Sequence, residues 1–113
     1  MPTNGDIFEL LRLELRRGSL ILAVLGHLRA EHYGYTLRKA LADAGVEIDE
    51  GALYPMLRRL EQQGLLTSEW REEDKRNKRF YRLSDEGRAV LGRLVAEWRA
   101  LNTSIADILK DEP

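Results

Sequence analysis

The fold is decided by residues 51–66, GALYPMLRRLEQQGLL, where a proline falls inside a helical pattern. Spacings of four and three, which place residues on one face of a helix, separate three leucines of this stretch, Leu53, Leu57 and Leu60. Pro55 lacks a backbone N–H, and its ring crowds the carbonyl four residues before it. The helix either begins at Pro55, since proline is tolerated as a first helical residue, or it begins earlier. In the second case Asp49 is its N-cap and the helix runs through Pro55 to Gly64.

Two further helical patterns precede this stretch. Residues 7–28 carry apolar residues on two stripes, so this helix needs two packing partners. Gly18 weakens its middle by about 1 kcal/mol relative to alanine and marks the place for a break or kink. Residues 33–44 predict a shorter helix, which Gly45 ends. Two short helices joined by a turn that contains glycine have the pattern of a helix-turn-helix.

Two segments compatible with β-strands follow, at residues 65–71 and 79–83. The seven residues from 72 to 78, EEDKRNK, carry six charges, and two short strands around such a polar loop predict a hairpin. We expect Asn77 to take the left-handed turn conformation in this loop. Three helices followed by a hairpin have the element order of a winged helix.

A final helix follows Ser84, which is a suitable N-cap. Its apolar residues are spaced 3, 4, 3, 4 and 3 apart, the heptad spacing of a seam between two helices, and they are Leu91, Leu94, Trp98, Leu101, Ile105 and Ile108. The spacing predicts that this helix pairs with another helix. We expect the last residues, 110–113, to fray.

The composition limits the classes of function. A chain of 113 residues, 43% of them hydrophobic and 33% charged, suits one globular domain. The lack of cysteine excludes disulfides and thiolate metal sites, and it fits a cytoplasmic location. We see no signal peptide, and the longest apolar run, residues 20–26, is too short to span a membrane. His27 and His32 have no serine or aspartate partner at a catalytic spacing, so we expect no enzyme, metal or cofactor.

The motifs YGYTLRKAL, LYP, RLEQQGLL and FYRLSDEGRAVL, in this order, resemble the PadR family of transcriptional regulators over nearly the whole chain. The resemblance implies a mainly α fold with a small β-hairpin. A winged helix-turn-helix DNA-binding domain would cover residues 1–83, and a C-terminal dimerisation helix would cover 84–113 in the same compact unit. It also implies a homodimer, usually a repressor, on a palindromic operator. The resemblance favours a helix that begins before Pro55.

Double-stranded DNA is the partner that the resemblance implies. Contacts would come from the helix-turn-helix residues Tyr35, Thr36, Ala52, Tyr54, Pro55 and Arg58 and from the wing residues Lys75, Arg76, Lys78 and Arg79. Basic side chains there suit phosphates, and the acidic 72–74 would face away. The alternative is that these are solvated surfaces, because the hairpin lacks a glycine-rich tip and Glu50 begins the recognition helix. A winged-helix protein–protein module without operator binding is the competing function.

Trp98 is the candidate ligand residue. Its indole is large for tight packing against its own copy across a two-fold axis. The chain resembles the smaller branch of the family, in which a tryptophan at this place lines a pore between subunits where flat aromatic drugs stack. The resemblance implies a planar aromatic effector there, contacted also by Leu94 and by Phe8, Leu11 or Leu15 of the partner's first helix. The alternative for Trp98 is dimer packing alone.

Overall fold

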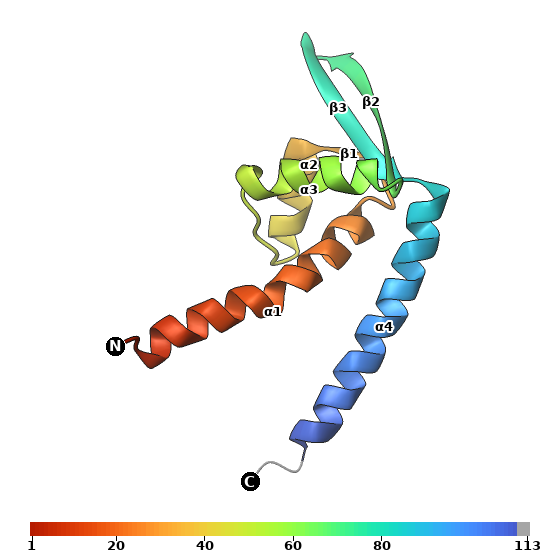
Figure 1. Cartoon of the computed structure of the whole chain (residues 1–113). Helices are drawn as coiled ribbons and strands as arrows, with labels where there is room; N and C mark the ends of the chain where they lie inside the picture. Colours follow the sequence, from red (N-terminus) through yellow and green to blue (C-terminus); the bar gives the residue numbers. More distant parts are fainter. Residues whose placement is uncertain (111–113) are drawn as a thin grey trace.

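The computed structural model describes residues 1–110, which form four helices and a three-stranded antiparallel sheet (Figure 1). The elements in chain order are α1 (Asn4–His27), β1 (His32–Tyr33), α2 (Gly34–Asp43), α3 (Glu50–Gln62), β2 (Leu66–Glu73), β3 (Arg76–Leu83) and α4 (Asp85–Leu109). The predicted mainly α fold with a hairpin wing is confirmed. The end of the predicted C-terminal unit and most of its expected fraying fall on residues 111–113, outside the described part.

The helix that decides the fold runs through its proline. Asp49 is the N-cap of α3, and its Oδ1 accepts a hydrogen bond of 2.8 Å from the backbone N–H of Ala52. Pro55 then lies in the second turn of α3. The carbonyl that it leaves without an intrahelical partner belongs to Gly51, in the first turn, where the chain is exposed to solvent. The earlier of the two predicted starts is therefore the correct one.

The turn of the wing differs from the prediction. Strands β2 and β3 pair up to Glu73 and Arg76, so only two residues connect them. These two, Asp74 and Lys75, have positive φ angles of 53° and 64°. The prediction that Asn77 supplies the left-handed residue is wrong, because Asn77 lies in β3 opposite Glu72. Two left-handed residues in succession make a tight turn whose twist matches that of the strands, and the strands therefore extend further than predicted.

Two smaller expectations also change. The helix predicted from Tyr33 begins at Gly34 instead, because Tyr33 and His32 form β1 and pair with Phe80 and Tyr81 of β3. A strand of two residues shows no alternation that a sequence could reveal. Helix α1 is continuous through Gly18, so the break considered at this glycine is absent.

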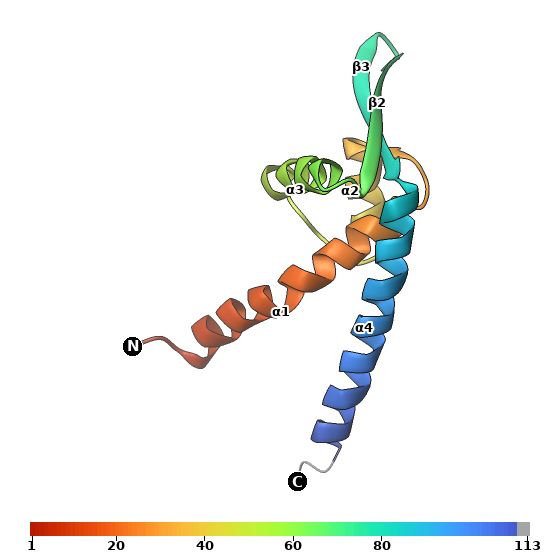
Figure 2. The ribbon, with the colours of Figure 1, turned by 45° about the vertical axis from the view of Figure 1, so that its right-hand side comes forward.

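The hydrophobic core gathers where all four helices meet the base of the sheet. It consists of Val24, Leu25, Leu28, Leu37, Leu41, Leu53, Leu57, Leu60, Leu66, Tyr81, Leu83 and Leu91. The long helices α1 and α4 contribute only the ends nearest the sheet. Their other halves project as two diverging arms, and the wing projects on the opposite side (Figures 1 and 2). The molecule measures 59 × 35 × 24 Å as a result.

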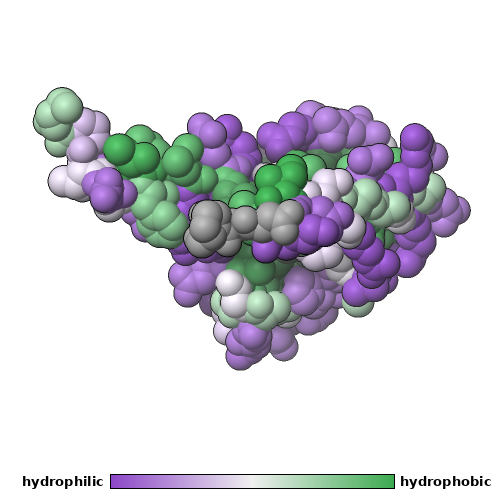
Figure 3. All heavy atoms as spheres, turned by 90° about the horizontal axis from the view of Figure 1, so that it is seen from below, coloured by the Kyte–Doolittle hydropathy of each residue, from purple (hydrophilic) through white to green (hydrophobic). Residues whose placement is uncertain are grey.

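The projecting halves of the two long helices expose large hydrophobic side chains. On α1 these are Ile7, Phe8, Leu10, Leu11, Leu13 and Leu15, and on α4 they are Leu94, Trp98, Leu101, Ile105, Ile108 and Leu109. Figure 3 shows hydrophobic residues along the projecting arm of α1 and near the end of α4. Across residues 1–110, no helix combines the length and the apolar character needed to cross a membrane.

The start of α4 is fixed against the end of α3. Ser84 accepts a hydrogen bond from the backbone N–H of Gly87 at 2.9 Å, and its Oγ donates to the carbonyl of Gly64 at 2.7 Å. Its backbone N–H donates to the carbonyl of Leu65. Gly87 lies directly on that same carbonyl, so close that a Cβ would stand 2.0 Å from the oxygen. The direction of the α4 arm is therefore set by the Ser84–Gly87 turn.

We expect Gly87→Ala to lower the free energy of unfolding by more than about 2 kcal/mol, because a rigid backbone group must move to admit the methyl group. Gly92→Ala in the same helix is the matched control, since a Cβ there meets nothing within 4 Å. It should raise the free energy of unfolding by up to about 1 kcal/mol through helix propensity. Urea denaturation followed by circular dichroism measures both, and equal effects would contradict the packing described.

Candidate nucleic-acid interface

The outer face of α3 is defined by its buried face. Leu53, Leu57 and Leu60 are in the core, which turns the intervening positions toward solvent. Tyr54 and Arg58 lie one helical turn apart on the exposed side, and Ala52 and Pro55 are exposed beside them. The four residues that sequence analysis assigned to this helix therefore share an accessible surface.

Tyr54 is only partly free, because its ring covers the start of α2. A Cβ on Gly34 would lie 2.1 Å from the Tyr54 Oη and 2.7 Å from two ring carbons. Gly34 is accordingly buried, while Tyr54 keeps 36% of its surface exposed. The glycine of the YGY motif thus makes room for the tyrosine of the LYP motif. Both motifs are recognisable in the sequence, but this contact was not predicted, because a glycine at the first position of a helix is its only signal.

The start of α2 presents Tyr35 next to a small polar cluster. Tyr35 is 62% exposed and its ring stacks against that of Tyr33 at 6.4 Å. The hydroxyl of Thr36 donates to the carbonyl of Tyr33 at 3.1 Å, so it accepts from Nδ1 of His32, also at 3.1 Å. Burial, followed by the charge of His27, lowers the pKa of His32 below its ordinary value. Thr36 therefore holds the turn, while Tyr35 faces solvent.

The four basic wing residues that the sequence assigned to DNA contact fall into two pairs. Lys75 and Arg76 are exposed at the turn, and within residues 1–110 neither has a carboxylate within 4 Å. Lys78 lies 3.8 Å and 3.9 Å from the carboxylates of Glu73 and Asp74. Arg79 forms an ion pair of 2.8 Å with Glu61 of α3. Of these four residues, only the two at the turn therefore carry unpaired positive charge.

The two faces of the wing are tied to different parts of the chain. On one face, the Glu61 carboxylate of α3 bonds both Ser68 of β2 and Arg79 of β3. On the other, Arg71 donates to Glu31, which precedes β1, and to Glu69. The hydrogen bond from Arg71 lowers the pKa of Glu31, and these two carboxylates raise the pKa of Arg71.

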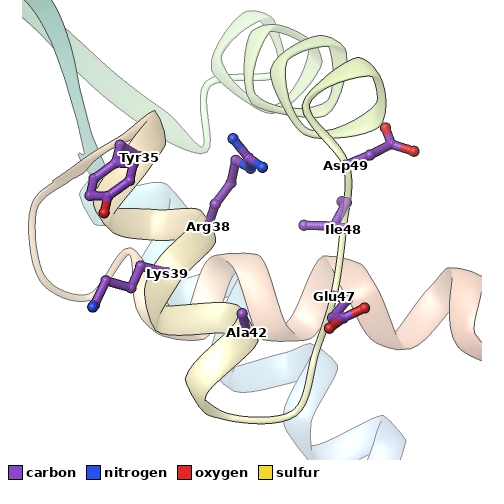
Figure 4. Close-up of a pocket in the computed structure, with 7 residues that line it drawn as sticks. All are labelled: Tyr35, Arg38, Lys39, Ala42, Glu47, Ile48 and Asp49. Atoms are coloured by element: carbon purple, nitrogen blue, oxygen red, sulfur yellow. The ribbon is translucent and has the colours of Figure 1, made fainter.

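A polar hollow of about 650 Å³ lies between α2 and the start of α3 (Figure 4). Arg38 extends across it toward α3 and donates a hydrogen bond to Glu50. The carboxylate of Glu50, the acidic residue noted at the start of the recognition helix, is therefore paired with a cation, which weakens its repulsion of a nearby phosphate. In the described part of the chain, no group of three metal-ligating side chains comes together.

Comparison with known proteins assigns the family. Residues 21–93 match the transcriptional regulator PadR-like family. The chain belongs to this family. It is 38% identical to the transcriptional regulator Rv3488 of Mycobacterium tuberculosis over 97 residues, which cover 85% of this chain and 88% of that protein. The matched family and this relative are both described as transcriptional regulators, not as enzymes.

Solved PadR structures have the same fold. The PadR family transcriptional regulator of Eggerthella lenta superposes with a TM-score of 0.89 at 44% identity, over 96% of either chain. A PadR-like transcription factor of Bacteroides fragilis superposes with a TM-score of 0.74 at 31% identity, over 87% of this chain and 97% of that one. The 96% coverage of the first structure takes in both long terminal helices.

The residues predicted to bind an effector lie on the projecting arms of this PadR-like chain. Trp98 is 45% exposed on α4, near the exposed Leu94, and the side chains of Phe8, Leu11 and Leu15 are exposed on α1. Leu91 differs from the rest of the predicted seam, because it is only 8% exposed and belongs to the chain's own core. The unpartnered part of the heptad stripe therefore begins at Leu94.

We expect Gly34→Ala to lower the free energy of unfolding by about 1–3 kcal/mol, because the added methyl group collides with the ring of Tyr54. In a Tyr54→Ala background the collision is absent, and the same substitution should be neutral or slightly stabilising. Thermal unfolding of the four proteins of this double-mutant cycle measures the coupling. An equal loss in both backgrounds would show that Gly34 is needed for another reason.

Proposed function

We propose that the chain is a homodimeric repressor that binds a pseudo-palindromic operator in double-stranded DNA. The observation that carries this proposal is the position of the exposed face of α3 beside a wing whose turn bears the unpaired Lys75 and Arg76. In a winged helix, α3 would enter the major groove, and the wing would lie along the backbone. Such a regulator works in the cytoplasm on the DNA there.

The proposed roles divide by chemistry. Tyr54 and Arg58 of α3 can reach base edges or phosphates with a hydroxyl and a guanidinium. Tyr35 and Thr36 at the start of α2, with Ala52 and Pro55, would approach the adjoining backbone. Lys75, Arg76 and Lys78 would neutralise phosphates without regard to sequence. Arg79 lies midway along the wing, where its guanidinium is paired with Glu61 of α3.

We expect the chain to bind duplex DNA from the region upstream of its own gene more tightly than a scrambled duplex, measured by fluorescence anisotropy. Affinity should fall steeply with salt, with a logarithmic slope of about −0.9 per phosphate neutralised. The double variant Lys75→Ala/Arg76→Ala should weaken both duplexes alike and make the slope shallower by about 2. An intact dimer with no salt-dependent affinity for DNA would favour the protein–protein module instead.

A second copy of the chain is the proposed cover for the projecting arms. Exposed leucines, isoleucines and aromatic residues on both α1 and α4 form more apolar surface than a stable monomer presents. A two-fold axis would bring the stripe from Leu94 to Ile108 against the partner's arms, and it would hold two copies of α3 about one helical turn of DNA apart. Dimerisation would therefore set the spacing of the operator's half-sites.

Trp98 is the proposed contact for a planar aromatic effector in that dimer. Such a compound, stacked on Trp98 and on Phe8, Leu11 or Leu15 of the partner, would change DNA affinity only if it prefers one arrangement of the two subunits. Binding and DNA affinity are then linked in both directions. Pure dimer packing of Trp98 is the competing role.

We expect a planar aromatic cation such as ethidium, added to the Trp70→Phe variant, to quench the emission of Trp98 and to change affinity for the operator. Trp70 is exposed on the wing and would emit as well, so its replacement supplies the necessary background. Quenching is measured by titrating the dye into the protein without DNA. Operator affinity is measured by titrating the protein into the duplex with and without the dye, after correction for dye bound to free duplex. The Trp98→Ala variant is tested in the same way for DNA binding. If the dye changes its operator affinity as much as it changes that of the protein with Trp98, Trp98 does not line the effector site.

A further inference from the structure

Three side chains close a hydrogen-bonded triangle between α3 and the wing. The carboxylate of Glu61, near the end of α3, accepts from Ser68 Oγ at 2.6 Å on one oxygen and from Arg79 Nη2 at 2.8 Å on the other. The third side joins Arg79 Nε to Ser68 Oγ at 3.0 Å. Because Ser68 lies in β2 and Arg79 in β3, one carboxylate holds both strands of the wing.

The surroundings of the triangle favour a single geometry. The side chains of Glu61 and Arg79 are only 26% and 34% exposed, so water competes less for them than for ion pairs on an open surface. The guanidinium of Arg79 also lies over the ring of Tyr81 at 5.4 Å and near that of Trp70 at 5.6 Å. A planar group held between rings and a carboxylate has little freedom to turn.

The triangle is also the outermost link between α3 and the wing. Arg79 pairs with Trp70, and three further residue pairs separate that position from the turn. Among the hydrogen bonds and ion pairs of residues 1–110, none joins α3 to the wing beyond Arg79. The link on the opposite face, through Arg71, reaches Glu31 and not α3. The angle between the wing and α3 therefore depends on Glu61.

We propose that Glu61 and Arg79 are positioning residues, which set the distance between the base-contacting face of α3 and the phosphate-contacting turn of the wing. The inference rests on the proposed function, since it matters only if both elements meet one DNA duplex. It assigns Arg79 a role different from the phosphate contact that its charge suggests, because Glu61 already neutralises that charge. Operator specificity would then depend on an acidic residue that touches no base.

The direction in which operator affinity changes when the charge of Glu61 is removed distinguishes this role from a purely electrostatic one. Glu61→Gln keeps the shape of the side chain and removes one negative charge close to the proposed DNA surface. If only charge matters, this variant binds every duplex more tightly. If Glu61 positions the wing, the variant loses affinity for the operator, whose contacts require α3 and the wing together. Affinity for unrelated DNA depends on the net positive charge and does not fall.

The test uses an operator duplex enriched by the wild-type chain from a random library, together with a scrambled duplex. We expect Glu61→Gln to bind the operator about tenfold more weakly and to bind the scrambled duplex no more weakly than wild type. Glu72→Gln is the matched control, because Glu72 is exposed on the same wing and has no ion pair among the described residues. It should not weaken binding to either duplex.

The double variant Glu61→Gln/Arg79→Gln tests the link itself. The loss in operator affinity should be no larger than that of the more severe single variant, since both substitutions break the same triangle. Additive losses, with a salt slope shallower by about 0.9 in Arg79→Gln, would show instead that Arg79 binds a phosphate directly. Circular dichroism at the assay temperature shows that each variant is folded. Ser68→Ala, which removes one side of the triangle without changing charge, should weaken operator binding about threefold.

The outcomes separate the two proposals. If wild type prefers the operator and Glu61→Gln binds it as tightly or more tightly, the positioning role is overturned while the proposed function stands. If wild type enriches no duplex and binds all DNA alike, the proposed function is overturned and the positioning role with it.

Discussion

The burial of three leucines on one face of α3 is the constraint on which the rest of the structure depends. Leu53, Leu57 and Leu60 can enter the core only if α3 turns this face toward the buried leucines of α1 and α2, which fixes its rotational setting. That setting turns Tyr54 and Arg58 outward and brings Glu61 to Ser68 and Arg79 of the wing. A rotation of α3 by one residue would bury a charge and expose a leucine. The packing of the core therefore fixes the orientation of the exposed face of α3.

Each of the two long helices has a packed end and a projecting end because the core is small. A chain of 113 residues cannot enclose helices as long as α1 and α4, and each one packs only its end nearest the sheet. Those ends lie side by side at the base of the sheet, where the backbone N–H of Leu83 donates to the carbonyl of Leu28 and the Ser84–Gly87 turn starts α4. Each arm is therefore a continuous helical extension of the domain that carries α3.

The features predicted from the sequence are those that local chemistry determines. Helical spacing located α3, and the capping side chains of Asp49 and Ser84 located the starts of α3 and α4. The features that were missed depend on residues distant in sequence. Nothing in the local sequence near Glu61 indicates that it meets Arg79, eighteen residues later. The turn was misplaced because Asn77 has the stronger left-handed preference, while strand pairing placed Asp74 and Lys75 at the bend.

The near-neutral net charge of −1 conceals an uneven distribution, because many acidic residues near the proposed DNA surface are already paired. Glu61 is bonded to Arg79, and Glu50 to Arg38. Glu73 and Asp74 lie within 4 Å of Lys78, which is the least exposed of these cations. Pairs of this kind contribute little net field at the distance of a DNA backbone, whereas Arg58, Lys75 and Arg76 contribute theirs undiminished. The charge available to DNA thus depends on where the unpaired basic residues lie, and net charge alone is a poor guide to nucleic-acid binding in this fold.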